Sequence, residues 1–250
     1  MSLEWIIKII EMYWPMFLRG AGVTLLIASV GTIFGALVGL LAGIIRTIPM
    51  PERGAKKALL KVINILLSIY IEFFRGTPMI VQAMVIFYGS AAAFGWDMDP
   101  IIAGIVIVSI NTGAYMAEIV RGGIISVDQG QYEAAQAIGM NHIQTMLNVV
   151  MPQVIRNILP ASGNHFIINI KDTAVLSVIS ITELFFQTKT VAGNNYRYFE
   201  AFFIVSIIYF VMTYAVTLIL RYFERKLDGP DNYSMVGHKQ NNETQVDLAK

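Results

Sequence analysis

The chain has 250 residues, of which 56% are hydrophobic and only 14% are charged, and its formal net charge at pH 7 is +1. A mean hydropathy of +0.61 is far above that of ordinary soluble domains and predicts an integral membrane protein. The small net charge offers no basic field to a nucleic acid, and the absence of cysteine excludes disulfides, thiolate metal sites and cysteine nucleophiles.

Charge-free apolar runs predict four helices that cross a membrane, each long enough or nearly so for a hydrocarbon core of about 30 Å. They cover residues 20–45, 76–96, 100–117 and 201–220. A fifth crossing is expected between residues 147 and 170, where the hydropathy is weaker and Pro152, Arg156 and Pro160 intervene. The start MSLEWIIKIIEMYWP does not resemble a cleaved signal, so we expect the first span to be retained.

The first run carries a glycine at every fourth position. Residues four apart share one face of a helix, and a stripe of glycines allows a second backbone to approach closely. We interpret this stripe as a helix-packing surface, formed by Gly31, Gly35, Gly39 and Gly43.

Residues 58–75 are apolar but include Lys61, Glu72 and Arg75. We expect a helix that lies along the inner membrane surface or enters there, with the crossing itself starting at the break RGTP, residues 75–78. A single long bent helix is the alternative.

The distribution of Lys and Arg predicts the orientation in the membrane. Residues 46–61 hold five basic residues and residues 221–226 hold three, whereas the turn FGWDMDP near Asp97 and Asp99 has none. Because basic residues stay on the cytoplasmic side, we expect the N-terminus outside and the 118–146 connection and the C-terminus inside. Five crossings fit this orientation, because an odd number places the two termini on opposite sides of the membrane.

Between residues 120 and 147 the chain becomes small and polar. Ser126 or Asp128 can cap a short helix over residues 131–138, and Gly139 can end it in a left-handed conformation. Asn141 and Gln144 resemble a capping pair that opens a second helix. The prediction is helix, tight turn, helix; periodicity alone favours an ordinary cytoplasmic loop that is helical.

The spacing in EAAQAIGMNHIQTMLNVVMP, residues 133–152, resembles the EAA loop of ABC importer permeases: Glu-Ala-Ala, three residues, Gly, nine residues, Ile-x-Leu-Pro. Val149 and Met151 stand where that pattern has Ile and Leu. Four further segments are similar, in order, to polar amino acid permeases of the histidine, glutamine and arginine type. They are FRGTPMIVQ (74–82), INTGAYMAEIVRGGI (110–124), ILPASGNHFI (158–167) and IKDTAVLSVI (170–179), and the resemblance covers residues 15–227.

This resemblance implies an all-α, multi-pass permease domain at residues 1–227 with the type I importer fold, in a bacterial inner or plasma membrane. It also implies a second permease subunit, which is a copy or a paralogue, two cytoplasmic ATPase subunits and an external amino acid-binding protein. The permease itself would be non-catalytic and without a cofactor, since ATP is bound by the partner. No Gly-Lys dipeptide occurs, so the chain has no P-loop of its own.

The EAA loop, about residues 126–152, is the coupling segment that sits in a cleft of the ATPase in that family. The resemblance assigns this role to Glu133, Ala134, Ala135, Gly139 and Pro152. Beyond the permease domain, the polar tail at residues 228–250 is expected to have no packed structure.

Polar side chains within the predicted spans are candidates for the transport path: Gln82, Asn111, Thr112, Tyr115, Asn164, His165 and Asn169. For each of them the alternative is a hydrogen bond between helices, worth about 0.6–2 kcal/mol. His165 stands apart because a titratable group at that depth is uncommon. Relatives often carry Glu or Gln there, and an acid would suit a cationic substrate, so we expect glutamine or glutamate ahead of arginine or lysine. A satisfied packing histidine is the alternative.

Other charged residues are interpreted as structural or gating elements. Glu118 with Arg121, and Lys171 with Asp172, can form local pairs. Arg156 can extend its stem to the inner interface.

Two other function classes fit less well. An intramembrane serine protease could use Ser162 with His165, but these residues lie three apart on one segment, and Pro160 stands where a GxSG pattern has Gly. A secondary transporter driven by an ion gradient usually has twin halves in one chain, and no internal duplication is visible here.

Overall fold

The structure, a computed structural model, describes residues 2–228, and these residues form helices without any strand. Four long helices build the bundle: α1 (Leu3–Thr47), α4 (Pro100–Ile125), α7 (Met151–Asp172) and α9 (Tyr198–Asp228). The shorter elements are α2 (Ala55–Gly76), α3 (Met79–Phe94), α5 (Gln129–Ala137), α6 (His142–Thr145), the π-helical turn η1 (Met146–Val150), the 3₁₀ helix η2 (Thr173–Ile179) and α8 (Leu184–Asn195). The all-α prediction is confirmed.

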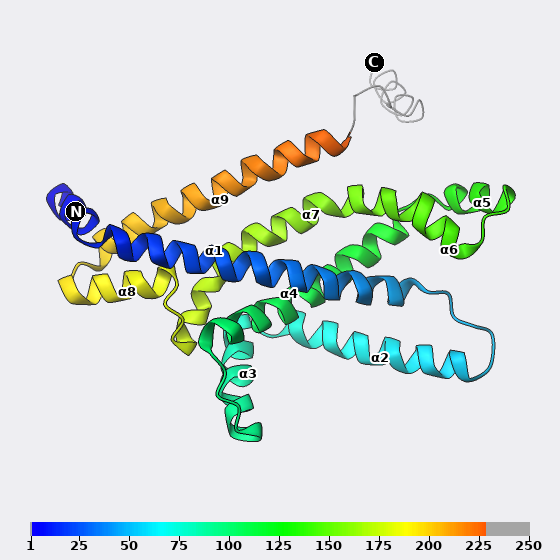
Figure 1. The fold of residues 1–250 in the computed structure, drawn as a ribbon, viewed down its shortest axis with the longest axis horizontal. Coiled ribbons are helices and arrows are strands. Elements are labelled where there is room, and N and C mark those ends of the chain that lie inside the picture. The colour runs from blue at the N-terminus through cyan, green and yellow to red at the C-terminus, as the bar shows by residue number, and fades with distance from the viewer. Residues whose placement is uncertain (1, 229–250) are drawn as a thin grey trace, which may run out of the picture.

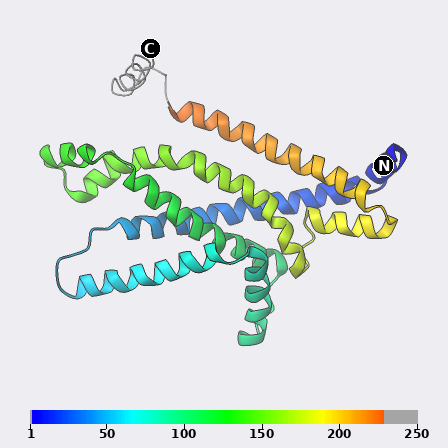
Figure 2. The same ribbon diagram turned by 180° about the vertical axis from the view of Figure 1, so that it is seen from behind.

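The two ends of the bundle are different. Figures 1 and 2 show the N-terminus and α8 at one end, and α5, α6 and the connection from α1 to α2 at the other. The basic connection at residues 46–61 therefore lies at the same end as residues 126–146. This arrangement agrees with the predicted orientation, in which both connections are cytoplasmic.

The glycine stripe of α1 packs against α4. A Cβ added to Gly39 would lie 2.3 Å from the Cβ of Met116, closer than real atoms allow. The same holds one and two turns earlier and one turn later, where the nearest atoms belong to residues spaced by four along α4. The pairs are Gly31 with Val108, Gly35 with Thr112, Gly39 with Met116 and Gly43 with Val120. The interpretation of the stripe as a packing surface is confirmed.

Residues 55–94 form two helices with the predicted break between them, at Thr77 and Pro78, both in extended conformation. Which of the two pieces crosses the membrane stays a prediction. Helix α2 follows the bundle, whereas α3 turns away across its long axis (Figures 1 and 2). Ile71 of α2 is fully buried, and the Tyr70 hydroxyl donates to the Ile110 carbonyl at 2.6 Å. The lysines of α2 all lie in its first two turns, whereas the residues that contact the bundle, Tyr70 and Ile71, lie in its later turns.

Within the described residues, three helices are long and apolar enough to cross a membrane: Leu3–Thr47, Pro100–Ile125 and Tyr198–Lys226. Helix α3 is apolar but has only 16 residues, and α2 and α7 contain more charged or polar side chains. Length and composition thus support three of the five predicted crossings. The first extends well beyond the predicted run, because the mixed segment from Leu3 onward continues the same helix through Pro15.

Helix α7 shows how the proline-containing fifth span is built. Pro152 is the second residue of α7, which directly continues the π-helical turn η1 without a break in the helical backbone. Pro160 lies inside the helix, which continues to Asp172. Neither proline ends the helix.

A buried carboxylate, which the sequence did not single out, joins three helices at the N-terminal end of the bundle. Glu183 is 0% exposed and caps α8 by accepting from the backbone N–H groups of Phe185 at 2.8 Å and Phe186 at 2.7 Å. The hydroxyls of Tyr209 on α9 and Thr24 on α1 donate to the same carboxylate, at 3.2 and 3.5 Å. Of the tail predicted at residues 228–250, Asp228 is the last residue of α9, and residues 229–250 lie outside the described part of the chain.

Candidate coupling surface and transport path

The predicted helix, turn and helix are present between α4 and α7. The Asp128 side chain caps α5 by accepting from the Gly130 N–H at 2.7 Å, so the helix begins two residues earlier than predicted. Gly139 has a φ of 83°, in the left-handed region that favours glycine. Asn141 and Gln144 form a reciprocal capping box with two bonds of 2.9 Å. These caps fix the angle between α5 and α6.

The outward side of this segment is bare and uncovered in the described chain. Glu133, Ala134 and Gly139 are exposed, and Ile138 between them is 76% exposed. Ala135 is only 3% exposed, so it packs inward and does not share this surface. Pro152 is exposed at the start of α7. Small side chains permit close approach of a partner's backbone, and the exposed isoleucine gives it apolar area to bury.

A charge cluster lies where α1 and α4 end. Arg121 Nη2 donates to Glu118 Oε2 at 2.8 Å, which confirms the predicted pair. Arg46 of α1 binds the same carboxylate, so the cluster ties two helices together. The expected pairing of Lys171 with Asp172 is not found among the ion pairs of residues 2–228.

Four of the candidate path residues hydrogen-bond across helices. Asn111 on α4 donates to the Gln82 side chain at 3.0 Å, and Gln82 in turn donates to the Phe74 carbonyl of α2 at 2.9 Å. This link holds the break between α2 and α3 against α4.

The second link joins α7 to two helices. Asn169 donates to Thr112 on α4 at 2.9 Å and to Thr32 on α1 at 2.7 Å. All four candidates in the two links are buried. Their bonds between helices favour the structural alternative, and Thr32, which sequence reasoning missed, is part of it.

Tyr115 and His165 form a separate group. Their rings lie 5.0 Å apart at an interplanar angle of 33°, and the Arg75 guanidinium lies 5.6 Å from the centre of the Tyr115 ring. His165 is 7% exposed, and within residues 2–228 its Nε2 atom has no hydrogen-bond partner. Both interpretations of His165, a path residue and a packing residue, stay predictions. Asn164 lies beside it on α7 but is exposed, so the candidate path residues do not form one continuous cluster in this chain.

Comparison with known proteins gives consistent matches. The family described as "Binding-protein-dependent transport system inner membrane component" matches residues 54–229. The glutamine transport system permease protein GlnP of Escherichia coli (strain K12) is 37% identical over 214 residues, which are 85% of this chain and 93% of that protein. The arginine transport system permease protein ArtQ of Bacillus subtilis (strain 168) is 32% identical over 217 residues, 87% of this chain and 94% of the relative.

A solved structure agrees with these relatives. The "Crystal structure of an amino acid ABC transporter with histidines" contains a chain that is 38% identical to this one, with a TM-score of 0.76. The match covers 90% of this chain and 99% of the other.

Proposed function

The chain belongs to the family of inner membrane components of binding-protein-dependent transport systems, and we propose that it is the permease subunit of an ATP-driven importer of a polar amino acid. The observation that carries this proposal is the exposed surface at Glu133, Ala134, Ile138 and Gly139, which we call the coupling surface. Caps at both short helices hold it in place. A rigid, bare protrusion on a membrane bundle is suited to transmit the movement of another subunit.

The proposed assembly follows the type I arrangement. Two ATPase subunits bind ATP on the cytoplasmic side, and closure of the pair moves each coupling surface and with it the bundle. A second permease subunit and an external binding protein complete it. We propose five crossings with the N-terminus outside, formed by α1, by α2 with α3, by α4, by α7 and by α9.

Co-purification tests the coupling surface. We expect Ala134→Arg to abolish recovery of the co-expressed ATPase subunit with the tagged chain, because an arginine there keeps the two backbones apart. Glu52→Arg is the matched control, since Glu52 is exposed at the same end of the bundle but outside the surface. Equal recovery with both variants would show that the ATPase docks elsewhere, and recovery with neither variant nor wild type would favour a carrier driven by an ion gradient.

We further propose that the substrate is glutamine or glutamate rather than arginine or lysine. The support comes from the group around His165: Arg75, whose guanidinium lies over the Tyr115 ring, is cationic. A cationic side chain would find no carboxylate among these three residues. GlnP, a relative, is named for glutamine, although ArtQ, at 32% identity, is named for arginine.

Uptake into proteoliposomes with the ATPase and the binding protein tests the substrate. We expect glutamine uptake to exceed arginine uptake in wild type. His165→Glu should shift this ratio toward arginine by about tenfold, since 1.4 kcal/mol of added attraction suffices. His165→Gln, neutral like the unprotonated imidazole, should keep the wild-type ratio. Arginine preferred by wild type, or a ratio unchanged by the acidic variant, would contradict the proposal.

A further inference from the structure

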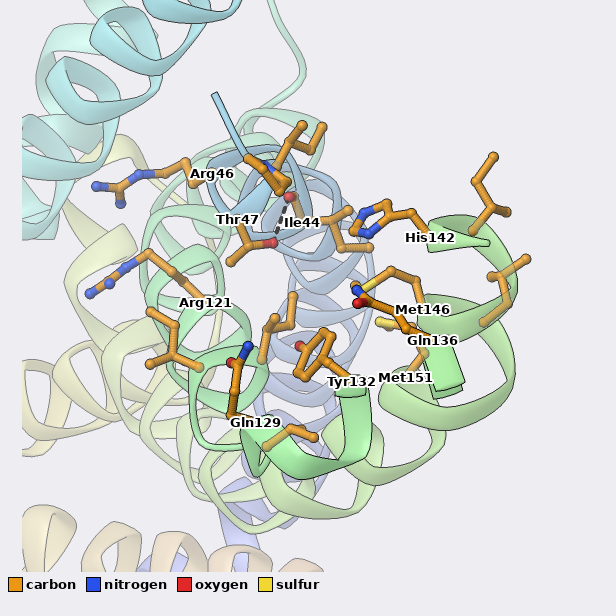
Figure 3. A pocket seen from close by; sticks show the side chains of 17 residues that line it. Ile44, Arg46, Thr47, Arg121, Gln129, Tyr132, Gln136, His142, Met146 and Met151 are labelled. Carbon is orange, nitrogen blue, oxygen red and sulfur yellow. Dashed lines mark hydrogen bonds between the residues drawn. The ribbon is translucent and has the colours of Figure 1, made fainter. Parts of the chain in front are cut away.

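A hollow of 880 Å³ lies at the end of the bundle that carries α5 and α6 (Figure 3). It is bounded by the ends of α1 and α4, by α5, and by the segment from His142 to Met151. Helix α5 contributes Gln129, Tyr132 and Gln136, whose spacing of three and four places them on one face. Ala134 lies on the opposite face, so the hollow is separate from the coupling surface.

The polar part of the lining is basic or hydrogen-bond donating. Of the 17 residues that line the hollow, none is acidic. Besides Thr47, whose hydroxyl already donates to the Ile44 carbonyl at 2.8 Å, the polar ones are Arg46, Arg121, Gln129, Tyr132, Gln136 and His142. Figure 3 shows the two arginines on one side and His142 on the other.

The residues that line the hollow carry a net positive charge. Arg46 and Arg121 share one carboxylate, that of Glu118, which is not part of the lining. Asp128, between the lining residues Val127 and Gln129, is a second carboxylate nearby, but the lining itself holds two arginines and no acidic residue. His142, which is exposed, lies on the other side of the lining. An anion is the complementary ligand.

The rest of the lining is apolar and sits where the long helices end. Ten of the 17 residues are apolar, and Ile125, Ile143 and Leu147 among them are 64%, 68% and 64% exposed. Helices α1 and α4, both able to cross a membrane, stop at Thr47 and Ile125. The hollow is therefore level with the membrane surface on the side that holds the basic connections, where basic residues meet lipid headgroups.

We propose that this hollow binds one anionic phospholipid of the cytoplasmic leaflet. Its phosphate lies between the arginine side and His142, and its acyl chains cover the exposed isoleucines and leucine. A soluble anion would leave the apolar wall uncovered. Because the lipid contacts α1, α4 and α5 at once, it links the coupling helix to the membrane bundle.

Native mass spectrometry of the full-length chain in mild detergent tests the site. The ATPase is left out, so a negative lipid result does not bear on the co-purification test of the proposed function. We expect one phosphatidylglycerol to bind saturably, at least about tenfold more tightly than phosphatidylcholine with the same chains. The double variant Gln129→Glu/His142→Glu should abolish this preference. Both residues are exposed, and a carboxylate in the first turn of α5 favours the helix, so folding is preserved.

Arg53→Gln is the control, because Arg53 is exposed in the same basic connection but does not line the hollow; it should bind phosphatidylglycerol like wild type. Equal binding of the two lipids, or an unchanged preference in the double variant, would overturn the proposal. Displacement of the lipid by glycerol phosphate would assign the hollow to a soluble anion, and displacement by the ATPase subunit would assign it to that protein. Either result also overturns it.

Discussion

Gly39→Val is expected to prevent stable folding of the chain. Its Cβ alone would meet Met116 Cβ at 2.3 Å and also two backbone atoms of α4, Ala117 N at 2.8 Å and Gly113 O at 2.9 Å. Rotation of a side chain cannot relieve a backbone contact, so the helices must separate. Overpacking of this kind costs about 1–3 kcal/mol and occasionally more. Fluorescence-detected size-exclusion chromatography after heating should show a lower unfolding midpoint, or no monodisperse protein.

Gly22→Val is the matched control for this prediction. Gly22 lies in the same helix, but an added Cβ finds no atom within 4 Å. The two variants share the change in helix propensity and in hydrophobicity and differ only in the contact with α4. Equal unfolding midpoints would mean that α1 and α4 are not packed through the glycine stripe.

Gly139→Val is expected to lower ATP-driven uptake by about tenfold or more. A non-glycine residue in the left-handed region costs about 1–2 kcal/mol, and 1.4 kcal/mol changes a population tenfold. The turn between α5 and α6 would open, and the coupling surface would lose its shape while the bundle stays folded. Uptake into proteoliposomes with the ATPase and the binding protein measures the effect, and an unchanged unfolding midpoint shows that the bundle is intact.

Two further variants test whether the loss of uptake comes from backbone strain at residue 139 in particular. Gly139→Asn should retain most of the uptake, because asparagine tolerates the left-handed conformation better than other residues. Gly54→Val introduces similar backbone strain, since Gly54 has a φ of 94°, but in a connection outside the coupling surface, and should leave uptake near the wild-type value. Wild-type uptake with Gly139→Val would show that the turn is not needed for coupling.

Local patterns predicted the local structure well. The αL glycine, the Asx cap and the capping box of residues 126–145 act over three or four residues, so their signals are complete within the sequence. The glycine stripe likewise indicated a packing surface, because residues four apart lie on the same face of a helix and glycines there let another helix approach closely. The direction of α3 could not be predicted in this way, since it depends on the link between Gln82 and Asn111, which are 29 residues apart.

The sequence by itself determined the membrane class, the family resemblance, the packing stripe and the two short capped helices between α4 and α7, because each rests on composition or on spacing along one helix or turn. Only the tertiary structure decided which buried polar side chains form hydrogen bonds between helices. It shows Asn169 bonded to Thr32 and Thr112, while the Nε2 atom of His165 has no hydrogen-bond partner among residues 2–228. It also brings Arg46 to Glu118 across 72 residues and closes a hollow beside α5. Such contacts join segments distant in sequence, and no periodicity encodes which segments meet.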